Sequence, residues 1–592
     1  MNREWNLDIL YKGYEDPAFF NDLSKLECIC EDMNQLANEI VNVEDKVSLR
    51  IVNQICDLWE AKIQLEECLI VYCSLRQSTD TSNAQSASYL SQISQKTSDC
   101  AKAESIFKKY LSKIENVEEF VTGDKRLESY TYLLNKIKKE SKHLLGDEAE
   151  EVIAKLDITG SMAWENLHSY LTSSVKGEYC GEEKTLTQLR NLAYDKDVNV
   201  RKAAYEAELA CYDKIKDSIC FSLNSIKGQV SALCKMRGYE SPLAMTLEQS
   251  HMKKETLDTM WQVIEEYLPV FHSYLRKKAE LLGERNGLSW YNLFAPVGES
   301  ETKFSAEEAK VYLINHFSGF SKELADMVEK AFDEEWIDFY PHSGKVGGAF
   351  CCNIQSKQQS RVLTNFNGTL SDVVTLAHEL GHAFHNENIH NHRILNLDYS
   401  MPVAETASTF NENVILNAAI SEASEDERFT LIEGQLQDLT QIICDIYSRY
   451  LFETEVFEQC KEQFMFSDEL KEIMLQAQKK AYGNGLNSEA LHPYMWVCKG
   501  HYYSGNISFY NFPYAFGGLF ARGLYAKYLK EGEAFLPKYK SLLHATTVCD
   551  VEEVASYAGI DLTRPEFWKD ALEQVKIQIE EFIRLCDKKL HL

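Results

Sequence analysis

The sparse distribution of proline and glycine constrains the fold of this chain more than any other feature. After Pro17 the next proline is Pro242, and no glycine lies between Gly13 and Gly123. Proline and glycine are the residues that most often break helices, so long stretches without them favour long α-helices. Apolar residues recur there at helical spacing, as in Leu133, Leu134, Ile137 and Leu144. We therefore expect a mostly α fold.

The sequence predicts two regions. Residues 1–190 are expected to form an N-terminal helical region, and residues 191–592, where proline, glycine and aromatic residues become more frequent, a catalytic region. Within the first, the Ser/Thr/Gln-rich run from Ser74 to Ser98 predicts a loop that enters another helix, with a disordered linker as the alternative. We find no repeat of fixed period.

Residues 339–370 differ from the helical pattern around them. They contain several turn residues and two short β-prone runs, at Gly348–Ile354 and Arg361–Phe366, which predict a small sheet. Helix resumes at Ser371, which we expect to be its N-cap. The predicted architecture is therefore mostly α, with a small β element directly before the motif described below.

Composition and charge exclude several classes of function. The 592 residues are 45% hydrophobic, enough for a substantial core, and 62 basic against 91 acidic residues give a net charge of −29. Such a surface repels phosphate backbones and anionic lipids, so we expect no nucleic acid and no membrane among the partners. The 17 cysteines without a C-x-x-C motif, together with the lack of a signal peptide or a long apolar stretch, predict a soluble cytoplasmic protein.

The motif that carries chemistry is HELGH at residues 378–382. On a helix, residues four apart share a face, so His378 and His382 can bind one metal ion, while Glu379 is placed to act on metal-bound water. Zinc in a hydrolytic site needs three protein ligands and one open position, so this motif alone is one ligand short. The alternative interpretation is an ordinary amphipathic helix that carries surface histidines.

The third ligand decides the class of site. A metzincin would need glycine and histidine at positions where this chain has His385 and Asn388, so that class is excluded. A carboxylate from a following helix remains: Glu405 would complete a His₂Glu site, and Glu412 lies seven residues on, along the same face, as a partner that orients a ligand histidine. The other candidates for the third ligand are His385, Glu387, His390 and His392. His385 falls on the same helix face, but we expect it to pack or hydrogen-bond beside the site rather than to bind the metal.

A second cluster of interest runs from residue 501 to 514 and contains His501, Tyr503, Tyr510 and Tyr514. A run of aromatic residues is most often core packing. Amide hydrolysis, however, generates an oxyanion, and tyrosine hydroxyls or histidine N–H groups are frequent donors to it. Both interpretations remain open from the residues alone.

These motifs together resemble the zinc metallopeptidases of the oligoendopeptidase F and thimet oligopeptidase family. The matching segments are HELGHAFH at 378–385, ETASTFNE at 405–412 and the His/Tyr-rich segment at 501–514. The opening WNLDILYKGYEDPAF and GKVGGAFC at 344–351 look specifically like oligoendopeptidase F. The resemblance covers nearly the whole chain.

The resemblance implies a large helical, two-lobed, clam-like body around a deep substrate channel, with one Zn²⁺ per chain. It implies His378, His382 and Glu405 as zinc ligands and Glu379 as the general base. It also implies that His501, Tyr503, Tyr510 and Tyr514 bind substrate or stabilise the transition state. The implied substrates are short unstructured peptides, cleaved at internal bonds; no oligomeric state is indicated, and a monomer is compatible with the sequence.

One departure from the family pattern affects the tyrosines. Residues 506–508 lengthen the interval between His501 and the tyrosine run, and Phe512 replaces its middle tyrosine, so which hydroxyl reaches the oxyanion is open. Two alternatives to an endopeptidase also remain. One is a zinc exopeptidase, with Arg522 as a candidate carboxylate clamp, and the other is a non-catalytic peptide-binding protein.

Overall fold

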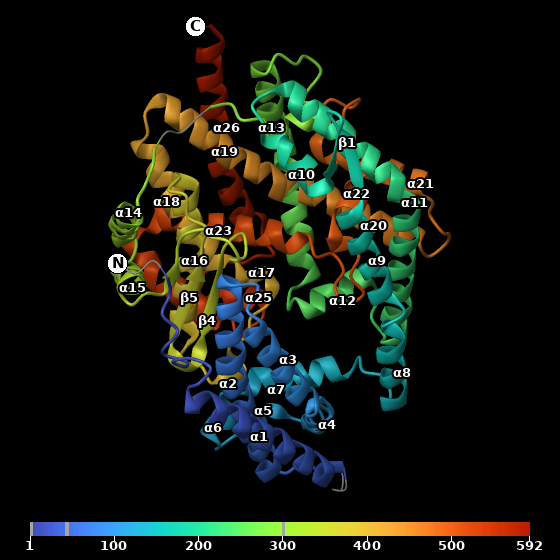
Figure 1. The fold of residues 1–592 in the computed structure, drawn as a ribbon, viewed down its shortest axis with the longest axis vertical. Helices are drawn as coiled ribbons and strands as arrows, with labels where there is room; N and C mark the ends of the chain where they lie inside the picture. Colours follow the sequence, from blue (N-terminus) through green and yellow to red (C-terminus); the bar gives the residue numbers. More distant parts are fainter. Residues whose placement is uncertain (1–3, 42–45, 299–301, 592) are drawn as a thin grey trace. The chain divides into compact units, whose positions relative to one another are not determined.

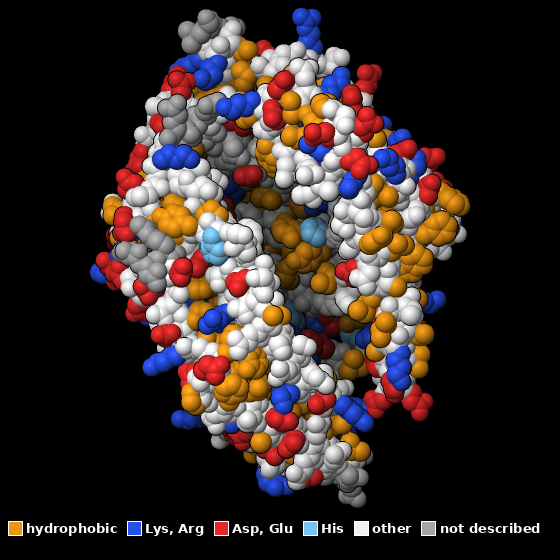
Figure 2. Space-filling view, in the orientation of Figure 1, with side chains coloured by type: hydrophobic (Ala, Val, Ile, Leu, Met, Phe, Trp, Pro, Cys, Tyr) orange, Lys and Arg blue, Asp and Glu red, His pale blue; other side chains and the backbone are white. Residues whose placement is uncertain are grey.

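The computed structural model describes residues 4–41, 46–298 and 302–591, and across these ranges the chain is mostly helical (Figure 1). The strands of the described residues form two small sheets. The prediction of a mostly α fold with a small sheet is therefore confirmed. Among the residues described, no helix is long and apolar enough to cross a membrane. On the face seen in Figure 2, acidic and basic side chains are interspersed.

Contacts within the chain divide it into two compact units, each built from three segments. Unit 1 comprises Met1–Leu144, Thr302–Ile415 and Glu531–Gly559, and unit 2 comprises Leu145–Glu301, Leu416–Lys530 and Ile560–Leu592. The predicted boundary at residue 190 separates two continuous stretches of sequence, whereas each unit is built from three separate segments. The predicted boundary therefore stays a prediction. The clam-like shape and the deep channel likewise stay predictions.

The helices of unit 1 are α1 (Pro17–Val41), α2 (Leu49–Thr79), α3 (Ala84–Ser98), α4 (Ala101–Leu111), α5 (Val117–Val121), α6 (Lys125–Glu128), α7 (Thr131–Ser141), α14 (Ala306–Ser318), α15 (Lys322–Asp333), α16 (Leu370–Ile389), α17 (Met401–Ala404), α24 (Leu536–Ala545) and α25 (Val551–Ser556). Helix α18 (Thr406–Glu422) begins in unit 1 and continues into unit 2. Helices α1 and α2 pack along each other over a buried apolar core, which supplies the driving force for this part of the fold.

The prediction of a loop over Ser74–Ser98 is wrong. Helix α2 continues to Thr79, and helix α3 occupies the rest of the run after a short turn. Asn83 caps α3, since its side-chain oxygen accepts a hydrogen bond from the backbone N–H of Ser86 at 2.9 Å. Most of the Ser and Gln side chains lie on the outer face, while Ile93 is buried on the inner face. The polar composition of this run therefore reflects the exposed face of a helix rather than a loop.

A three-stranded sheet lies directly before α16 in the sequence and packs against it. Its strands are β3 (Ile337–Asp338), β4 (Phe350–Ile354) and β5 (Gln359–Leu363), in the order β3-β5-β4. Strand β3 is parallel to β5, whereas β4 is antiparallel to β5 and forms one edge of the sheet. The two predicted β-prone runs thus correspond to β4 and β5.

Helix α16 begins at a capping box rather than at the predicted N-cap, Ser371. The Thr369 hydroxyl accepts a hydrogen bond from the backbone N–H of Asp372 at 3.1 Å, and the Asp372 carboxylate accepts one from the backbone N–H of Thr369 at 2.9 Å. Ser371 is followed three residues later by Val374, which cannot return such a bond. The reciprocal pair therefore places the helix start two residues earlier.

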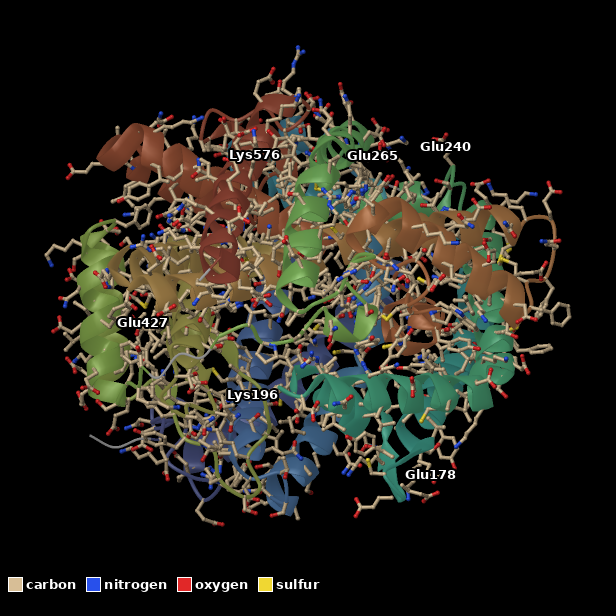
Figure 3. All side chains as sticks on the ribbon, turned by 90° about the horizontal axis from the view of Figure 1, so that it is seen from above. Glu178, Lys196, Glu240, Glu265, Glu427 and Lys576 are labelled. Atoms are coloured by element: carbon tan, nitrogen blue, oxygen red, sulfur yellow. The ribbon has the colours of Figure 1, made fainter. Side chains whose placement is uncertain are left out.

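The helices of unit 2 are α8 (Asp147–Asp157), α9 (Ser161–Ser174), α10 (Leu186–Asn191), α11 (Val198–Met236), α12 (Pro242–Gln249), α13 (Lys254–Leu281), α19 (Glu425–Thr440), α20 (Ile446–Gln459), α21 (Ser467–Tyr482), α22 (Met495–Cys498), α23 (Phe512–Glu531) and α26 (Pro565–His591). Helix α11 is 39 residues long, and α13 packs along α26. In Figure 3, Glu240 and Glu265 lie at the outer surface of this unit.

Unit 2 also contains a β-hairpin that the sequence did not lead us to expect. Strands β1 (Lys176–Tyr179) and β2 (Glu182–Thr185) pair antiparallel across a two-residue turn. Cys180 and Gly181 in that turn have φ angles of 52° and 84°. Positive φ at both central residues is the geometry of the tight hairpin turns that match strand twist. Five of the eight strand residues are charged, so the sequence shows no alternation of apolar and polar residues that would predict these strands.

Candidate metal centre

Helix α16 brings the side chains of its HELGH motif together. The candidate ligand atoms of His378, Glu379 and His382 all lie within 4.8 Å of one another. The two imidazole centres are 5.0 Å apart, with ring planes at 82°. This is the consequence of four-residue spacing on a helix, which stacks the two histidines on one face. Both imidazoles can therefore reach a single ion.

Glu405 faces both histidines from the short break between α17 and α18. Its Oε2 atom lies 3.3 Å from Nε2 of His378 and 3.4 Å from Nε2 of His382. The hydroxyl of Ser408 donates a hydrogen bond to the same Oε2 at 2.7 Å, which fixes the carboxylate in this position. Two imidazole nitrogens and one carboxylate oxygen thus converge on a common point.

Gly381 allows α18 to approach α16 closely enough for this convergence. A Cβ atom at this position would lie 2.5 Å from Cα of Ser408 and 2.6 Å from the backbone oxygen of Ala407. Both contacts are with backbone, which cannot move aside as a flexible side chain can. Because Ala407 and Ser408 lie only two and three residues after Glu405, the glycine inside the motif determines how near the third carboxylate can come.

Glu412 contacts the other side of His378. Its carboxylate accepts a hydrogen bond from Nδ1 of His378, so the proton resides on Nδ1 and Nε2 faces Glu405. Glu412 lies two helical turns after Glu405, as the sequence spacing suggested. The Asn411 amide donates to the backbone oxygen of Ala377 at 3.2 Å and links α18 to α16 at the same level.

The charges around this point attract a cation. Burial alone would lower the pKa of His378, but Glu405 and Glu412 outweigh it and raise that pKa to about 10. Burial raises the pKa of Glu405, yet its hydrogen bonds to His378 and His382 hold that pKa well below its usual range. Two imidazoles and one carboxylate are the donor set of hydrolytic zinc sites, where zinc–nitrogen distances are about 2.0–2.1 Å. The residues present therefore fit a zinc ion.

Glu379 differs from the other carboxylates of this centre. It is only 6% exposed, and its carboxylate makes no hydrogen bond with any residue that the structure describes. Burial raises its pKa, opposed by the nearby imidazoles of His378 and His382. A buried carboxyl that is not tied to protein donors is suited to take up and release a proton.

His385 lies beside this point but uses its ring for packing. Nε2 of His385 is hydrogen-bonded to the hydroxyl of Thr546 at 2.8 Å, and the ring stacks on Tyr399 at 4.5 Å. Burial, and secondarily the charge of His382, lowers the pKa of His385 to about 3. His385 is therefore neutral, and its Nε2 atom is already engaged.

The remaining candidates for the third ligand are placed elsewhere. Glu387 and His390 line a separate cavity of about 780 Å³ in unit 1. Nε2 of His392 is hydrogen-bonded to the backbone oxygen of His544 at 2.9 Å. Among the candidates weighed from the sequence, Glu405 is the one whose carboxylate reaches both histidines.

Three residues of the predicted His/Tyr segment meet in unit 2. The ring of His501 lies 5.1 Å from Tyr510 and 5.8 Å from Tyr514, and the two tyrosine rings are 5.7 Å apart. Tyr514 is 40% exposed, so its ring reaches the surface of the unit. Burial and then the cations Arg449 and Lys499 lower the pKa of His501. This imidazole is therefore mostly neutral at pH 7.

Tyr503 is not part of that group. It is completely buried, its ring stacks on His168 at 3.8 Å, and its hydroxyl donates to the backbone oxygen of Trp496 at 2.8 Å. The structure therefore separates Tyr503 from the other three residues and favours a packing role for it. Alternation in the sequence could not show this, because neighbouring aromatic residues of an irregular segment point in unrelated directions.

Comparison with known families adds independent support. A family model described as Peptidase family M3 matches residues 191–574, and one described as Oligopeptidase F matches residues 113–176. The chain belongs to peptidase family M3. It is thus a metallopeptidase of the oligoendopeptidase F type, and the resemblance seen in the sequence is confirmed.

Relatives of this M3 peptidase match it over most of their length. An oligoendopeptidase F homologue of Lactococcus lactis is 25% identical over 540 residues, which covers 89% of each chain. Oligopeptidase PepF of Bacillus subtilis is 25% identical over 536 residues, 88% of this chain and 79% of the relative. These alignments extend the similarity well beyond the metal-binding motif.

Solved structures share the fold of this M3 peptidase. A crystal structure from Chlamydophila abortus superposes with a TM-score of 0.84 at 19% identity and covers 98% of both chains. Oligoendopeptidase F from Enterococcus faecium superposes with a TM-score of 0.66 at 21% identity, over 96% of this chain and 98% of that one. At these identities the likeness establishes the fold alone.

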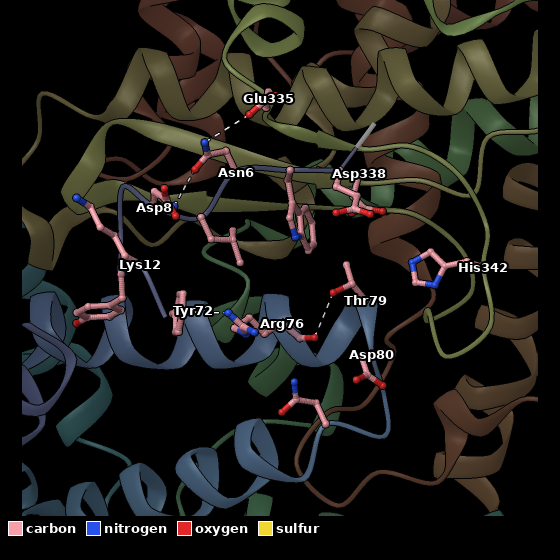
Figure 4. A pocket seen from close by; sticks show the side chains of 15 residues that line it. Asn6, Asp8, Lys12, Tyr72, Arg76, Thr79, Asp80, Glu335, Asp338 and His342 are labelled. Carbon is pink, nitrogen blue, oxygen red and sulfur yellow. Dashed lines mark hydrogen bonds between the residues drawn. The ribbon is translucent and has the colours of Figure 1, made fainter. Parts of the chain in front are cut away.

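Unit 1 of this M3 peptidase also contains a cavity of about 450 Å³ beside α2. Figure 4 shows Arg76 and Thr79 of α2 across from Asn6 and Asp8 of the N-terminal segment. None of the predicted site residues lines this cavity.

Among the residues around the metal centre, the sequence analysis did not identify Ser408. Its position three residues after Glu405, in the first turn of α18, offered a signal.

Proposed function

We propose that this M3 peptidase is a zinc-dependent endopeptidase that hydrolyses internal bonds of short unstructured peptides. The convergence of His378, His382 and Glu405 on one point carries this proposal. These three side chains would hold the ion, with Glu412 orienting His378 and Ser408 orienting Glu405. When bound, zinc supplies Lewis-acid chemistry, which polarises a carbonyl and lowers the pKa of water to about 7.

Glu379 is the general base in this proposal. Its carboxylate accepts a proton from the attacking water and then delivers it to the nitrogen of the leaving amine. The raised pKa of Glu379, caused mainly by burial, makes its protonated form accessible during this transfer. The absence of a hydrogen bond between Glu379 and the other described residues leaves both carboxylate oxygens available for it.

The His/Tyr group of unit 2 supplies binding and stabilising contacts in this proposal. The rings of His501, Tyr510 and Tyr514 lie 5.1–5.8 Å from one another, which brings one imidazole and two hydroxyl groups together. A hydroxyl that donates a hydrogen bond to the oxyanion of the transition state typically contributes a factor of about 10²–10³ to the rate. Tyr503 is left out of this set because its hydroxyl is engaged inside the core.

Strand β4 offers a site for an extended substrate. It pairs with β5 on one side, and no other strand of the described residues pairs with its second edge. Strand β4 packs against α16, the helix that carries the general base Glu379. A peptide that adds to this edge would present its backbone to the metal centre by β-augmentation.

The substrate class and location complete the proposal. Relatives named oligopeptidase or oligoendopeptidase support peptides rather than folded proteins as substrates. All 17 cysteines are free, in keeping with the cytoplasmic location expected from the sequence. An exopeptidase would need a group that captures a chain terminus, and Arg522 was the sequence's candidate for it.

Mass spectrometry of cleavage products tests the proposal. A ladder of unstructured peptides of increasing length is incubated at neutral pH with the purified protein, with and without a chelator. We expect internal cleavage of short peptides that stops in the chelator and returns on addition of zinc. Trimming at one terminus would instead establish an exopeptidase. No cleavage by zinc-loaded protein would leave the non-catalytic binding role.

A further inference from the structure

Unit 2 contains a completely buried ion pair that the proposed function does not use. Nζ of Lys227 on α11 lies 2.6 Å from Oε1 of Glu453 on α20, and both side chains are 0% exposed. The ammonium group also lies 4.8 Å from the ring centre of Phe457. A buried pair often stabilises a fold no more than apolar residues of the same volume would, so a role in orienting other groups accounts for it better.

The second oxygen of this carboxylate orients an amide. Oε2 of Glu453 accepts a hydrogen bond from Nδ2 of Asn511 at 3.2 Å, and Asn511 is fully buried directly after Tyr510. An ionised carboxylate can only accept hydrogen bonds. Glu453 therefore fixes which end of the amide is which: the nitrogen points to the ion pair, and Oδ1 points away from it.

The amide oxygen of Asn511 and the ring of His501 are complementary. Oδ1 of Asn511 and Nδ1 of His501 are both buried, and neither has a hydrogen-bond partner within 3.5 Å among the described residues. Burial, Arg449 and Lys499 lower the pKa of His501, whereas the Asn511 side chain raises it. The bond to Glu453 directs the nitrogen of the amide to the ion pair, so the oxygen is the free end, and the ring of the preceding residue, Tyr510, lies 5.1 Å from that of His501. Such contacts are often long before substrate binds and then shorten.

We propose that Asn511 is a positioning residue for His501, held in orientation by the buried Lys227–Glu453 pair. Its Oδ1 atom accepts the hydrogen of Nδ1, which holds the neutral imidazole in its Nδ1–H tautomer and leaves Nε2 as an acceptor. His501 therefore accepts a hydrogen bond from a substrate backbone N–H, and donation to the oxyanion falls to the tyrosine hydroxyls. This inference rests on the proposed role of His501 and assigns it to substrate binding.

The ring nitrogens of His501 report this arrangement without any measurement of activity. Protein labelled with ¹⁵N-histidine is examined by NMR, and the His501 signals are assigned by their loss in H501N. We expect the Nδ1–H tautomer in the natural protein, and the Nε2–H tautomer or a mixture in N511A and in the double variant K227M/E453Q. A glutamine at position 453 can donate as well as accept, so it no longer fixes the Asn511 amide.

A second buried pair of unit 2 provides a matched control. Lys278 and Glu433 are also 2.6 Å apart and nearly fully buried, but they contact neither His501 nor Asn511. The double variant K278M/E433Q should therefore lose stability to a similar degree and leave the His501 tautomer unchanged. If N511A does not fold, K227M/E453Q carries the test alone, with thermal melting to confirm that it is folded.

Kinetics separate this inference from the proposed function. Loss of one hydrogen bond to substrate predicts that kcat/KM falls about tenfold in N511A, with no further loss in the H501A background. An Nε2–H tautomer in the natural protein would overturn the inference. Additive losses of kcat/KM in the double variant H501A/N511A would also overturn it. The expected tautomer with full activity of H501A would support the contact and overturn the part of His501 in the proposed function.

Discussion

Glu412 accepts a hydrogen bond from Nδ1 of His378, while Oε2 of Glu405 lies 3.3 Å from Nε2 of the same ring. Each nitrogen of this imidazole therefore faces a different carboxylate. The two carboxylates serve different purposes in the proposed site: Glu405 shares the ion with His378, and Glu412 decides which nitrogen is turned toward it. Substitution of Glu405 should therefore remove a metal ligand, whereas substitution of Glu412 should only disturb the orientation of His378.

Replacement of Glu412 by glutamine should weaken zinc binding without removing a ligand. Loss of such an orienting partner typically lowers metal affinity about 10–100-fold. Competition with a chromophoric chelator measures the affinity directly. Glu422 lies exposed near the end of the same helix, so E422Q should bind zinc as the natural protein does. Equal affinities of E412Q and E422Q would contradict the orienting role.

Replacement of Glu379 by glutamine should separate catalysis from metal binding. The substitution keeps the shape of the side chain and removes its capacity to move a proton, so turnover should fall by at least about 10²-fold. The ligand set is unchanged, and elemental analysis should still find one zinc per chain. Activity above a few per cent of the natural level would rule out Glu379 as the base.

The sequence could predict which side chains gather at the proposed metal centre, because much of its geometry is local. Four-residue spacing places His378 and His382 on one helix face, and a seven-residue interval separates Glu405, directly before α18, from Glu412 two turns along. Contacts between helices could not be predicted from the sequence. Nothing in the motif revealed that a Cβ atom at position 381 would lie only 2.5 Å from the backbone of the following helix.

Composition was misleading where one face of an element dominated it. The polar run that became α3 was interpreted as a loop, because Ile93 is its one large side chain that is completely buried. Tyr503 was grouped with its neighbours by residue type, although its hydroxyl bonds the core carbonyl of Trp496. In both cases the packing partners lie far away in the sequence or on another element, and local pattern does not identify them.

The tyrosines of the 501–514 segment should separate into structural and functional groups. Y503F removes a buried hydrogen bond and leaves the Trp496 carbonyl unpaired, which predicts a loss of about 1–3 kcal/mol in the free energy of unfolding with kcat unchanged. Y510F or Y514F should change stability less than Y503F does, and the one that removes a donor to the oxyanion should lower kcat by about 10²–10³-fold. Denaturant unfolding and peptide kinetics measure the two quantities. A fall of kcat in Y503F alone would reverse the assignment.

Replacement of Gly381 by alanine should disturb both stability and metal binding, because the added Cβ would meet backbone atoms of Ala407 and Ser408. Overpacking of this kind typically costs about 1–3 kcal/mol, and separation of the helices would move Glu405 away from the histidines. Gly434 is also inside a helix but has open space around it. There alanine should raise the free energy of unfolding by about 0.5–1 kcal/mol. If G381A matched G434A in stability and bound zinc normally, the close approach of α16 and α18 would not be required for the site.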